Sequence, residues 1–157
     1  MTTPIRKPGS LESSSRKGVA AVECAIVAPL LMLLVLGAVD VGQYANVCQK
    51  VSDASREGAR VAARYETLTQ SQVVTAVMNY LQDAFPNVPP STIAAAAQVT
   101  LTNAGGSPIS SGDMTSVATG SQLSVTVTLQ FDLIRWISHV QFLSGSDVAV
   151  TTKMRRE

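Results

Sequence analysis

The feature that most constrains this chain is an apolar run from Val19 to Val39, 21 residues in which Glu23 is the only charge. As a helix the run is about 31 Å long, close to the thickness of the hydrocarbon core of a bilayer. Basic residues precede the run and few follow it closely, which predicts that the N-terminus stays in the cytoplasm. We therefore expect a cytoplasmic leader over residues 1–18, a single transmembrane helix over 19–39, and an extracytoplasmic domain over 40–157 that begins by continuing the helix.

Two other structures fit a run of this kind. A buried helix of a soluble protein is the first, but so small a domain would hardly cover the leucine-rich part of the run on every side. A cleaved secretory signal is the second, because a basic leader before an apolar core is typical of one. The run is longer than the usual core of about 7–15 residues and no A-x-A site follows it, which favours an anchor in the cytoplasmic (inner) membrane.

Charge and composition exclude several function classes. The net charge of the chain is +1, so it has no basic excess with which to neutralise the phosphates of a nucleic acid. The lone histidine, His139, has no Cys or carboxylate cluster at ligand spacing. Cys24 and Cys48 would lie roughly 36 Å apart on one helix, far beyond the reach of a disulfide. We expect no enzyme, no catalytic residue, no metal and no cofactor.

After Asp40 the chain becomes amphipathic without a helix breaker. One apolar stripe recurs at alternating spacings of three and four and comprises Val41, Tyr44, Cys48, Val51, Ser55, Gly58, Ala62 and Tyr65. The small side chains of Ser55, Gly58 and Ala62 predict helix-sheet packing, because they let another element approach the backbone closely. The charges on the other faces predict a solvated surface with pairs such as Glu57 and Arg60.

A second helix and three strands are expected in the remainder. The helix is predicted over Ser71 to Phe85, ended by Pro86 and the Pro89-Pro90 pair. Alternating segments predict antiparallel strands at residues 98–102, 121–131 and 147–154, with one apolar face that must be covered. The fold class is therefore α+β, a long N-terminal transmembrane and amphipathic helix packed on a small three-stranded antiparallel sheet.

Glu23 has two interpretations. It lies four residues into the run, so its carboxylate is able to reach the interface, and it then needs no function. Alternatively, cleavage after Gly18 would create a new amine at Val19, four residues before Glu23 and on the same helix face. In a low dielectric these charges attract strongly, within one chain or between neighbouring chains.

The glycine-to-glutamate spacing before an apolar helix resembles the processing site of type IV pilin-like proteins. More specifically, "RKGVAAVECAIVAPLLMLLVLGAVDVGQ" is similar to the N-terminal signature of the TadE-like family of tight adherence (Flp) pilus systems. "ASREGARVAA", from Ala54 to Ala63, is similar to the second signature of that family, and the ending "KMRRE" to its C-terminus. Val19 departs from the Phe or Met that pilins usually carry at the first mature position.

The resemblance implies a type IV pilin-like fold and a single-pass minor pilin or pseudopilin that helps to assemble a thin adhesive pilus. Gly18, Val19 and Glu23 would be the processing and assembly residues, and Pro29, Gly37 and Asp40 the residues that pack the transmembrane segment. The implied partners are the bilayer, other pilin-like subunits, the pilus assembly machinery and a prepilin peptidase. A membrane-tethered binding domain that uses the loops from Asn103 to Gly120 and from Asp132 to Gly145 is the alternative function.

Overall fold

The structure is a computed structural model that describes residues 12–64, 66–109, 114, 117–135 and 143–157. The chain divides into two compact units, Met1–Val39 and Asp40–Glu157. Helix α1 runs from Glu12 to Ala63 and belongs to both units. The other elements all lie in the second unit: α2 (Gln70–Ala84), α3 (Pro90–Ala96), β1 (Ala97–Asn103), β2 (Gln122–Gln130), α4 (Phe131–Ile134) and β3 (Asp147–Arg155).

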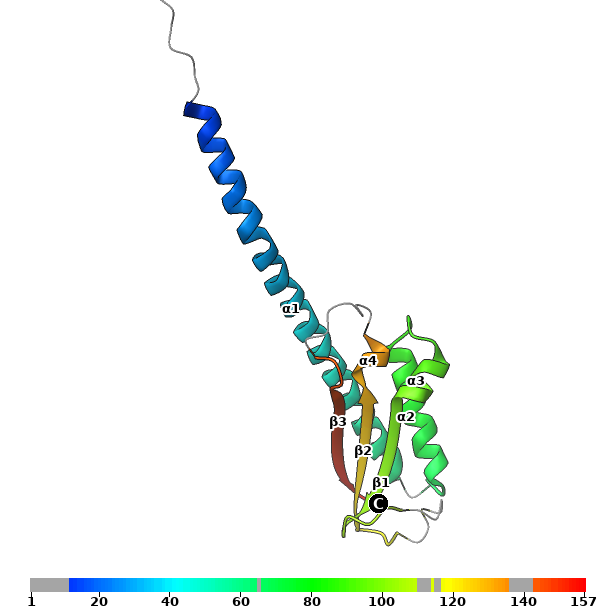
Figure 1. Cartoon of the computed structure of the whole chain (residues 1–157). Helices are drawn as coiled ribbons and strands as arrows, with labels where there is room; N and C mark the ends of the chain where they lie inside the picture. The colour runs from blue at the N-terminus through cyan, green and yellow to red at the C-terminus, as the bar shows by residue number, and fades with distance from the viewer. Residues whose placement is uncertain (1–11, 65, 110–113, 115–116, 136–142) are drawn as a thin grey trace, which may run out of the picture. The chain divides into compact units, whose positions relative to one another are not determined.

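The three strands form one antiparallel sheet in the order β1-β2-β3, as Figure 1 shows. Val99 of β1 pairs with Val127 of β2, which pairs with Val150 of β3. One residue along, the row is Thr100, Thr126 and Thr151, so side chains alternate between an apolar face and a threonine-rich face. The predicted α+β fold class, with its long N-terminal helix and three-stranded antiparallel sheet, is confirmed.

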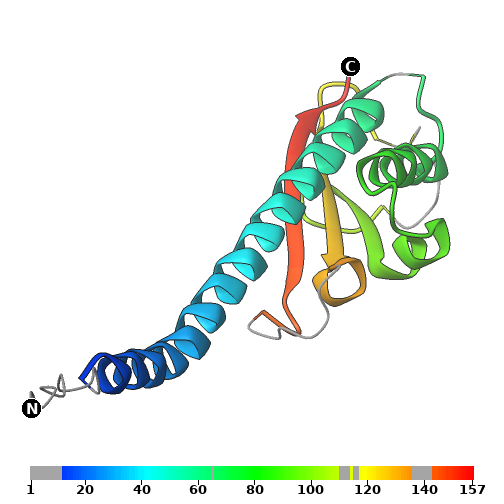
Figure 2. The same ribbon diagram turned by 90° about the horizontal axis from the view of Figure 1, so that it is seen from above.

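Two helices cover the apolar face of the sheet. The second-unit part of α1 runs along the sheet beside β3, and α2 also packs against it (Figures 1 and 2). The core that they enclose includes Val51, Ala54 and Ala59 of α1, Val73, Val77 and Leu81 of α2, and Leu101, Leu123, Val125, Val127 and Leu129 of the sheet. Apolar rows at a period of two on the strands and near 3.6 on the helices therefore meet in one layer.

Three details differ from the sequence prediction. Residues after the Pro89-Pro90 pair form α3 instead of leading directly into a strand, because proline is well suited to the first position of a helix and Ala-rich sequence follows it. The second strand ends at Gln130, and Phe131 begins the short α4 while remaining fully buried.

The third difference is the width of the buried face of α1. Val41 is 57% exposed, whereas Ala54 and Ala59, which lie outside the predicted stripe, are buried. The face is wider than a single stripe because the sheet and α2 contact different sides of α1. Tyr65, the last member of the predicted stripe, lies outside the described residues.

Candidate functional site on the N-terminal helix

The first-unit part of α1 presents apolar side chains on all sides. The exposed fraction is 59% for Val19, 71% for Ile26 and 66% for Leu34. Between Gly18 and Ala63 the helix is long and apolar enough to cross a membrane. A surface of this kind is costly in water, so it needs lipid or the apolar face of another chain around it.

Gly18 and Val19 are adjacent on this helix, Glu23 lies about one turn farther on, and all three are exposed. A Cβ added at Gly18 would meet nothing within 4 Å. The packing of the described chain therefore does not require a glycine at this position. If the residue is constrained, the constraint comes from outside the fold.

Pro29 and Gly37 lie farther along the same helix. Pro29 is inside α1, and the helix continues through it although proline lacks the N–H for a hydrogen bond to the carbonyl four residues earlier. Gly37 is half-buried. These residues and the three before them all lie on α1.

Asp40, predicted from the sequence to pack the transmembrane segment together with Pro29 and Gly37, belongs to the folded unit. Its side chain is buried, and its Oδ2 accepts a hydrogen bond from the backbone N–H of Leu143 at 3.3 Å. Asp132 accepts from the N–H of Gly145 at 2.8 Å, so two carboxylates hold the same turn. Asp40 thus fastens the start of the folded unit to the segment before β3.

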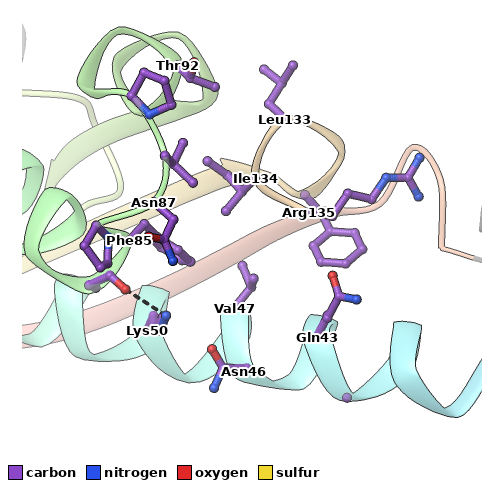
Figure 3. A pocket seen from close by; sticks show the side chains of 16 residues that line it. Gln43, Asn46, Val47, Lys50, Phe85, Asn87, Thr92, Leu133, Ile134 and Arg135 are labelled. Carbon is purple, nitrogen blue, oxygen red and sulfur yellow. Dashed lines mark hydrogen bonds between the residues drawn. The ribbon is translucent and has the colours of Figure 1, made fainter. Parts of the chain in front are cut away.

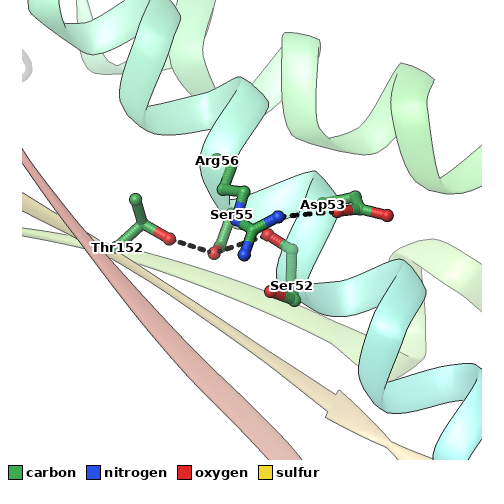
Figure 4. Close-up of polar contacts among 5 residues, drawn as sticks. All are labelled: Ser52, Asp53, Ser55, Arg56 and Thr152. Carbon is green, nitrogen blue, oxygen red and sulfur yellow. Dashed lines mark hydrogen bonds and ion pairs between the residues drawn. The ribbon is translucent and has the colours of Figure 1, made fainter.

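Ser55 joins α1 to the sheet. Its Oγ is buried, donates to the backbone oxygen of Ser52 at 3.0 Å, and lies 2.5 Å from the hydroxyl of Thr152 on β3 (Figure 4). Because Ser55 has a single hydroxyl proton, Thr152 donates in the second contact. A serine within a helix is therefore satisfied here by one local and one long-range bond.

Gly58 and Ala62, one and two turns farther on, are buried at the same interface. A Cβ at Gly58 would lie 2.5 Å from Val77 Cγ2 and 3.3 Å from Val125 Cγ1. The absent side chain of Gly58 lets α1, α2 and β2 meet at one point. The sequence predicted that a sheet approaches α1 closely at these small residues. In the structure α2 approaches α1 there as well.

Residues 18–60 match the family model described as TadE-like protein. This segment is TadE-like. The resemblance inferred from the two sequence signatures is confirmed over these residues, and it indicates a role in Tad pilus assembly. No curated protein and no solved structure matches the chain.

The TadE-like segment ends in a charged, solvent-facing turn. Arg60 binds Glu57 through two contacts, Nε to Oε2 at 2.8 Å and Nη2 to Oε1 at 2.5 Å. The hydrogen bonds from Arg60 lower the pKa of Glu57, and partial burial opposes this shift. Both side chains are substantially exposed, so this predicted pair is a surface feature with little effect on stability.

Several contacts of the folded unit have no simple signal in the sequence. The guanidinium of Arg156 is buried and donates to the backbone oxygens of Met114 and Thr67. Tyr44 packs edge-to-face on Phe131 with ring centroids 5.3 Å apart, and burial raises the pKa of Tyr44, with a smaller contribution from Cys48. Arginine followed by glutamate at a C-terminus looks like a solvated tail, and only the fold shows otherwise. His139 lies outside the described residues.

Proposed function

We propose that this chain is a membrane-anchored minor pilin or pseudopilin that takes part in assembly of a tight adherence (Flp, type IVc) pilus. It acts through helix-helix association along the first-unit part of α1, without catalysis. The observation that carries the proposal is the coincidence, on one helix, of a TadE-like match over residues 18–60 with an exposed apolar surface of membrane-spanning length.

The proposed position is the cytoplasmic membrane, with the N-terminus in the cytoplasm and the second unit outside. Residues 1–18 carry Arg6, Lys7, Arg16 and Lys17 against Glu12, a net charge of 4 − 1 = +3. The positive-inside tendency supports this orientation. The second unit, with its sheet and its own core, then acts as the extracytoplasmic part of a subunit.

Processing after Gly18 by a prepilin peptidase is part of the proposal. It is supported by the open surroundings of Gly18, since the described fold gives no other reason for a glycine there. The new amine of Val19 would lie one turn from the Glu23 carboxylate. If the amine of one subunit pairs with Glu23 of the next, the pair sets the register between the two helices, because an unpaired charge in the membrane is costly.

The test replaces Glu23 with alanine and uses Cys24→Ala as the matched control, since Cys24 is the next residue on the same exposed helix. We expect Glu23→Ala to insert in the membrane normally but to co-assemble poorly with other pilus subunits, which lowers pilus yield strongly. Cys24→Ala should leave the yield unchanged. The measurements are extraction of the chain from membranes and quantification of sheared pili.

Mass spectrometry of the wild-type chain in the same cultures checks the processing step, for which a mature terminus at Val19 is expected. A chain that still starts at Met1 or Thr2 contradicts processing and leaves only anchoring. Normal pilus yield in Glu23→Ala contradicts the assembly role of the carboxylate. Recovery of the wild-type chain in the medium, with a terminus beyond Val39, contradicts anchoring altogether.

A further inference from the structure

A groove of about 780 Å³ lies in the second unit between α1, the segment from α2 to α3, and α4 (Figure 3). Gln43, Val47 and Lys50 of α1 form its floor, Phe85 and the residues that follow it form one wall, and α4 with Arg135 forms the other. Its volume is in the range of sites that hold small ligands or short peptide segments. Gly18, Val19 and Glu23, the first-unit residues proposed to act in assembly, do not line this groove.

The charge of this groove is one-sided. Among the sixteen lining residues there are two cations, Lys50 and Arg135, and no carboxylate. Arg135 contacts Asp132 at 3.3 Å, outside the lining. Lys50 has neutral contacts: its Nζ donates to the backbone oxygen of Ala84 at 2.7 Å and lies 4.4 Å from the centroid of the Phe85 ring.

The two acidic residues of α1 that follow Lys50 most closely form ion pairs with other residues. Asp53 contacts Arg56, and Glu57 contacts Arg60. Within the described residues no ion pair reaches Lys50. An ammonium group has three protons to donate, so Lys50 retains donors for an anion in the groove.

Gln43 supplies a second recognition group, seven residues before Lys50. Its amide nitrogen and oxygen are both buried, and neither has a hydrogen-bond partner within the part of the chain that the structure describes. Figure 3 shows this side chain pointing from α1 toward the α4 side of the groove. A buried amide without partners loses its hydration without compensation, whereas the N–H and C=O of a peptide group would satisfy both ends.

We propose that the groove between α1, the α2–α3 segment and α4 binds an extended polypeptide segment of a partner protein that carries a carboxylate. The carboxylate binds Lys50, a backbone peptide group binds Gln43, and an apolar side chain between them packs on Val47. Lys50 has only neutral contacts here and the lining has no carboxylate, so charge complementarity selects this occupant over a basic or neutral one.

The two recognition groups also set a spacing. Seven residues of helix place Gln43 and Lys50 about 10 Å apart along α1. An extended chain advances about 3.3 Å per residue, so the carboxylate lies about three residues from the peptide group bound by Gln43. The preferred segment therefore has an apolar residue shortly before or after its acidic residue.

This inference concerns the folded unit and adds a binding surface to the proposed pilus function, but it is tested without pili. The full chain is reconstituted in phosphatidylcholine nanodiscs, and fluorescence anisotropy measures binding of three pools of labelled decapeptides. The pools share mixed alanine, serine, valine and leucine and differ only in a fixed central glutamate, glutamine or lysine.

We expect the glutamate pool to bind about tenfold more tightly than the glutamine pool, and the lysine pool to bind most weakly. Lys50→Gln should abolish the preference for glutamate, and Lys50→Arg should retain it. Gln43→Leu should weaken all pools while leaving the preference in place. Arg56→Gln is the matched control, because Arg56 is an exposed cation of α1 outside the groove and should change nothing. The melting temperature of each variant checks its folding.

Equal binding of the pools, or a glutamate preference that persists in Lys50→Gln, overturns the proposal. A Lys50→Gln effect confined to binding of phosphatidylglycerol vesicles would assign the groove to an anionic lipid headgroup and would also overturn it. So would an effect confined to self-association of the chain, measured by light scattering. Failure of the Glu23→Ala test alone would leave the groove assignment intact, because Glu23 takes no part in it.

Discussion

Gly18, Gly42 and Gly58 of α1 differ in whether the packing around them requires a glycine. At Gly58 a Cβ would lie 2.5 Å from Val77 Cγ2, a separation that real side chains do not reach. At Gly42 and Gly18 a Cβ would meet nothing within 4 Å. The packing of the folded unit thus requires glycine at Gly58 and does not require it at the other two positions.

Gly58→Ala should lower the free energy of unfolding by about 1–3 kcal/mol, because the added methyl forces Val77 and Val125 out of their positions. Gly42→Ala is the matched control on the same helix. It should be neutral or raise the free energy of unfolding by up to about 1 kcal/mol, since alanine is the better helix former. Urea unfolding of the detergent-solubilised chain, followed by circular dichroism, measures both variants. Equal stability of the two variants would show that Gly58 does not determine the packing of α1 on α2.

The packing of α1 against β3 includes a polar contact within a largely apolar layer. Thr152 lies on the apolar face of the sheet, in register with Val125, and its hydroxyl meets that of Ser55. The same sheet carries a second hydroxyl pair, Thr126 and Thr151, 2.8 Å apart on its opposite, more exposed face. The two pairs have similar geometry but different surroundings, which makes them a matched comparison.

A double-mutant cycle with Ser55→Ala and Thr152→Val should give a coupling energy of about 1 kcal/mol, because burial makes the loss of either partner costly. The cycle with Thr126→Val and Thr151→Val should give a coupling near zero, since water replaces the lost partner. Chemical unfolding of the single and double variants measures both values. A coupling at Ser55 no larger than that at Thr126 would mean that the contact does not fasten the helix to the sheet.

The C-terminal residues Arg156 and Glu157 connect several segments of the second unit by hydrogen bonds. The backbone N–H of Glu157 donates to Ala63 at the end of α1, and Arg156 exchanges backbone hydrogen bonds with Gly120 and Ser121 before β2. The guanidinium of Arg156 adds bonds to Thr67 and Met114. Segments from four parts of the chain are thus joined through one arginine.

Arg156→Ala should lower the free energy of unfolding by about 2–3 kcal/mol, because it removes the charge-assisted hydrogen bonds from a buried guanidinium to the carbonyls of Thr67 and Met114. Arg155→Ala is the control one residue away, and as an exposed side chain it should change stability by less than about 0.5 kcal/mol. Thermal unfolding of both variants is the measurement. Similar melting temperatures for the two would contradict the role given to Arg156.

Much of this protein follows from local sequence. The run from Val19 to Val39 and the positive leader specify an apolar helix, and the alternation at Leu123, Val125 and Val127 specifies a strand with one buried face. These features were predictable because the periods of the helix and the strand are properties of the backbone, independent of what packs on it. The TadE-like signatures were also recognisable from the sequence, because they lie in one continuous segment of the chain.

Tertiary structure decided which of several similar residues is buried and by what. Arg155 and Arg156 are alike in sequence, yet only the second is buried, because the last strand places it beside the carbonyls of Met114 and Thr67. In the same way, the groove brings Gln43 and Lys50 of α1 together with residues from near positions 85 and 135. Local periodicity predicts that one face of a helix or strand is buried. Which residues bury that face depends on contacts between segments far apart in the chain. Only the folded arrangement of helices and sheet determines those contacts.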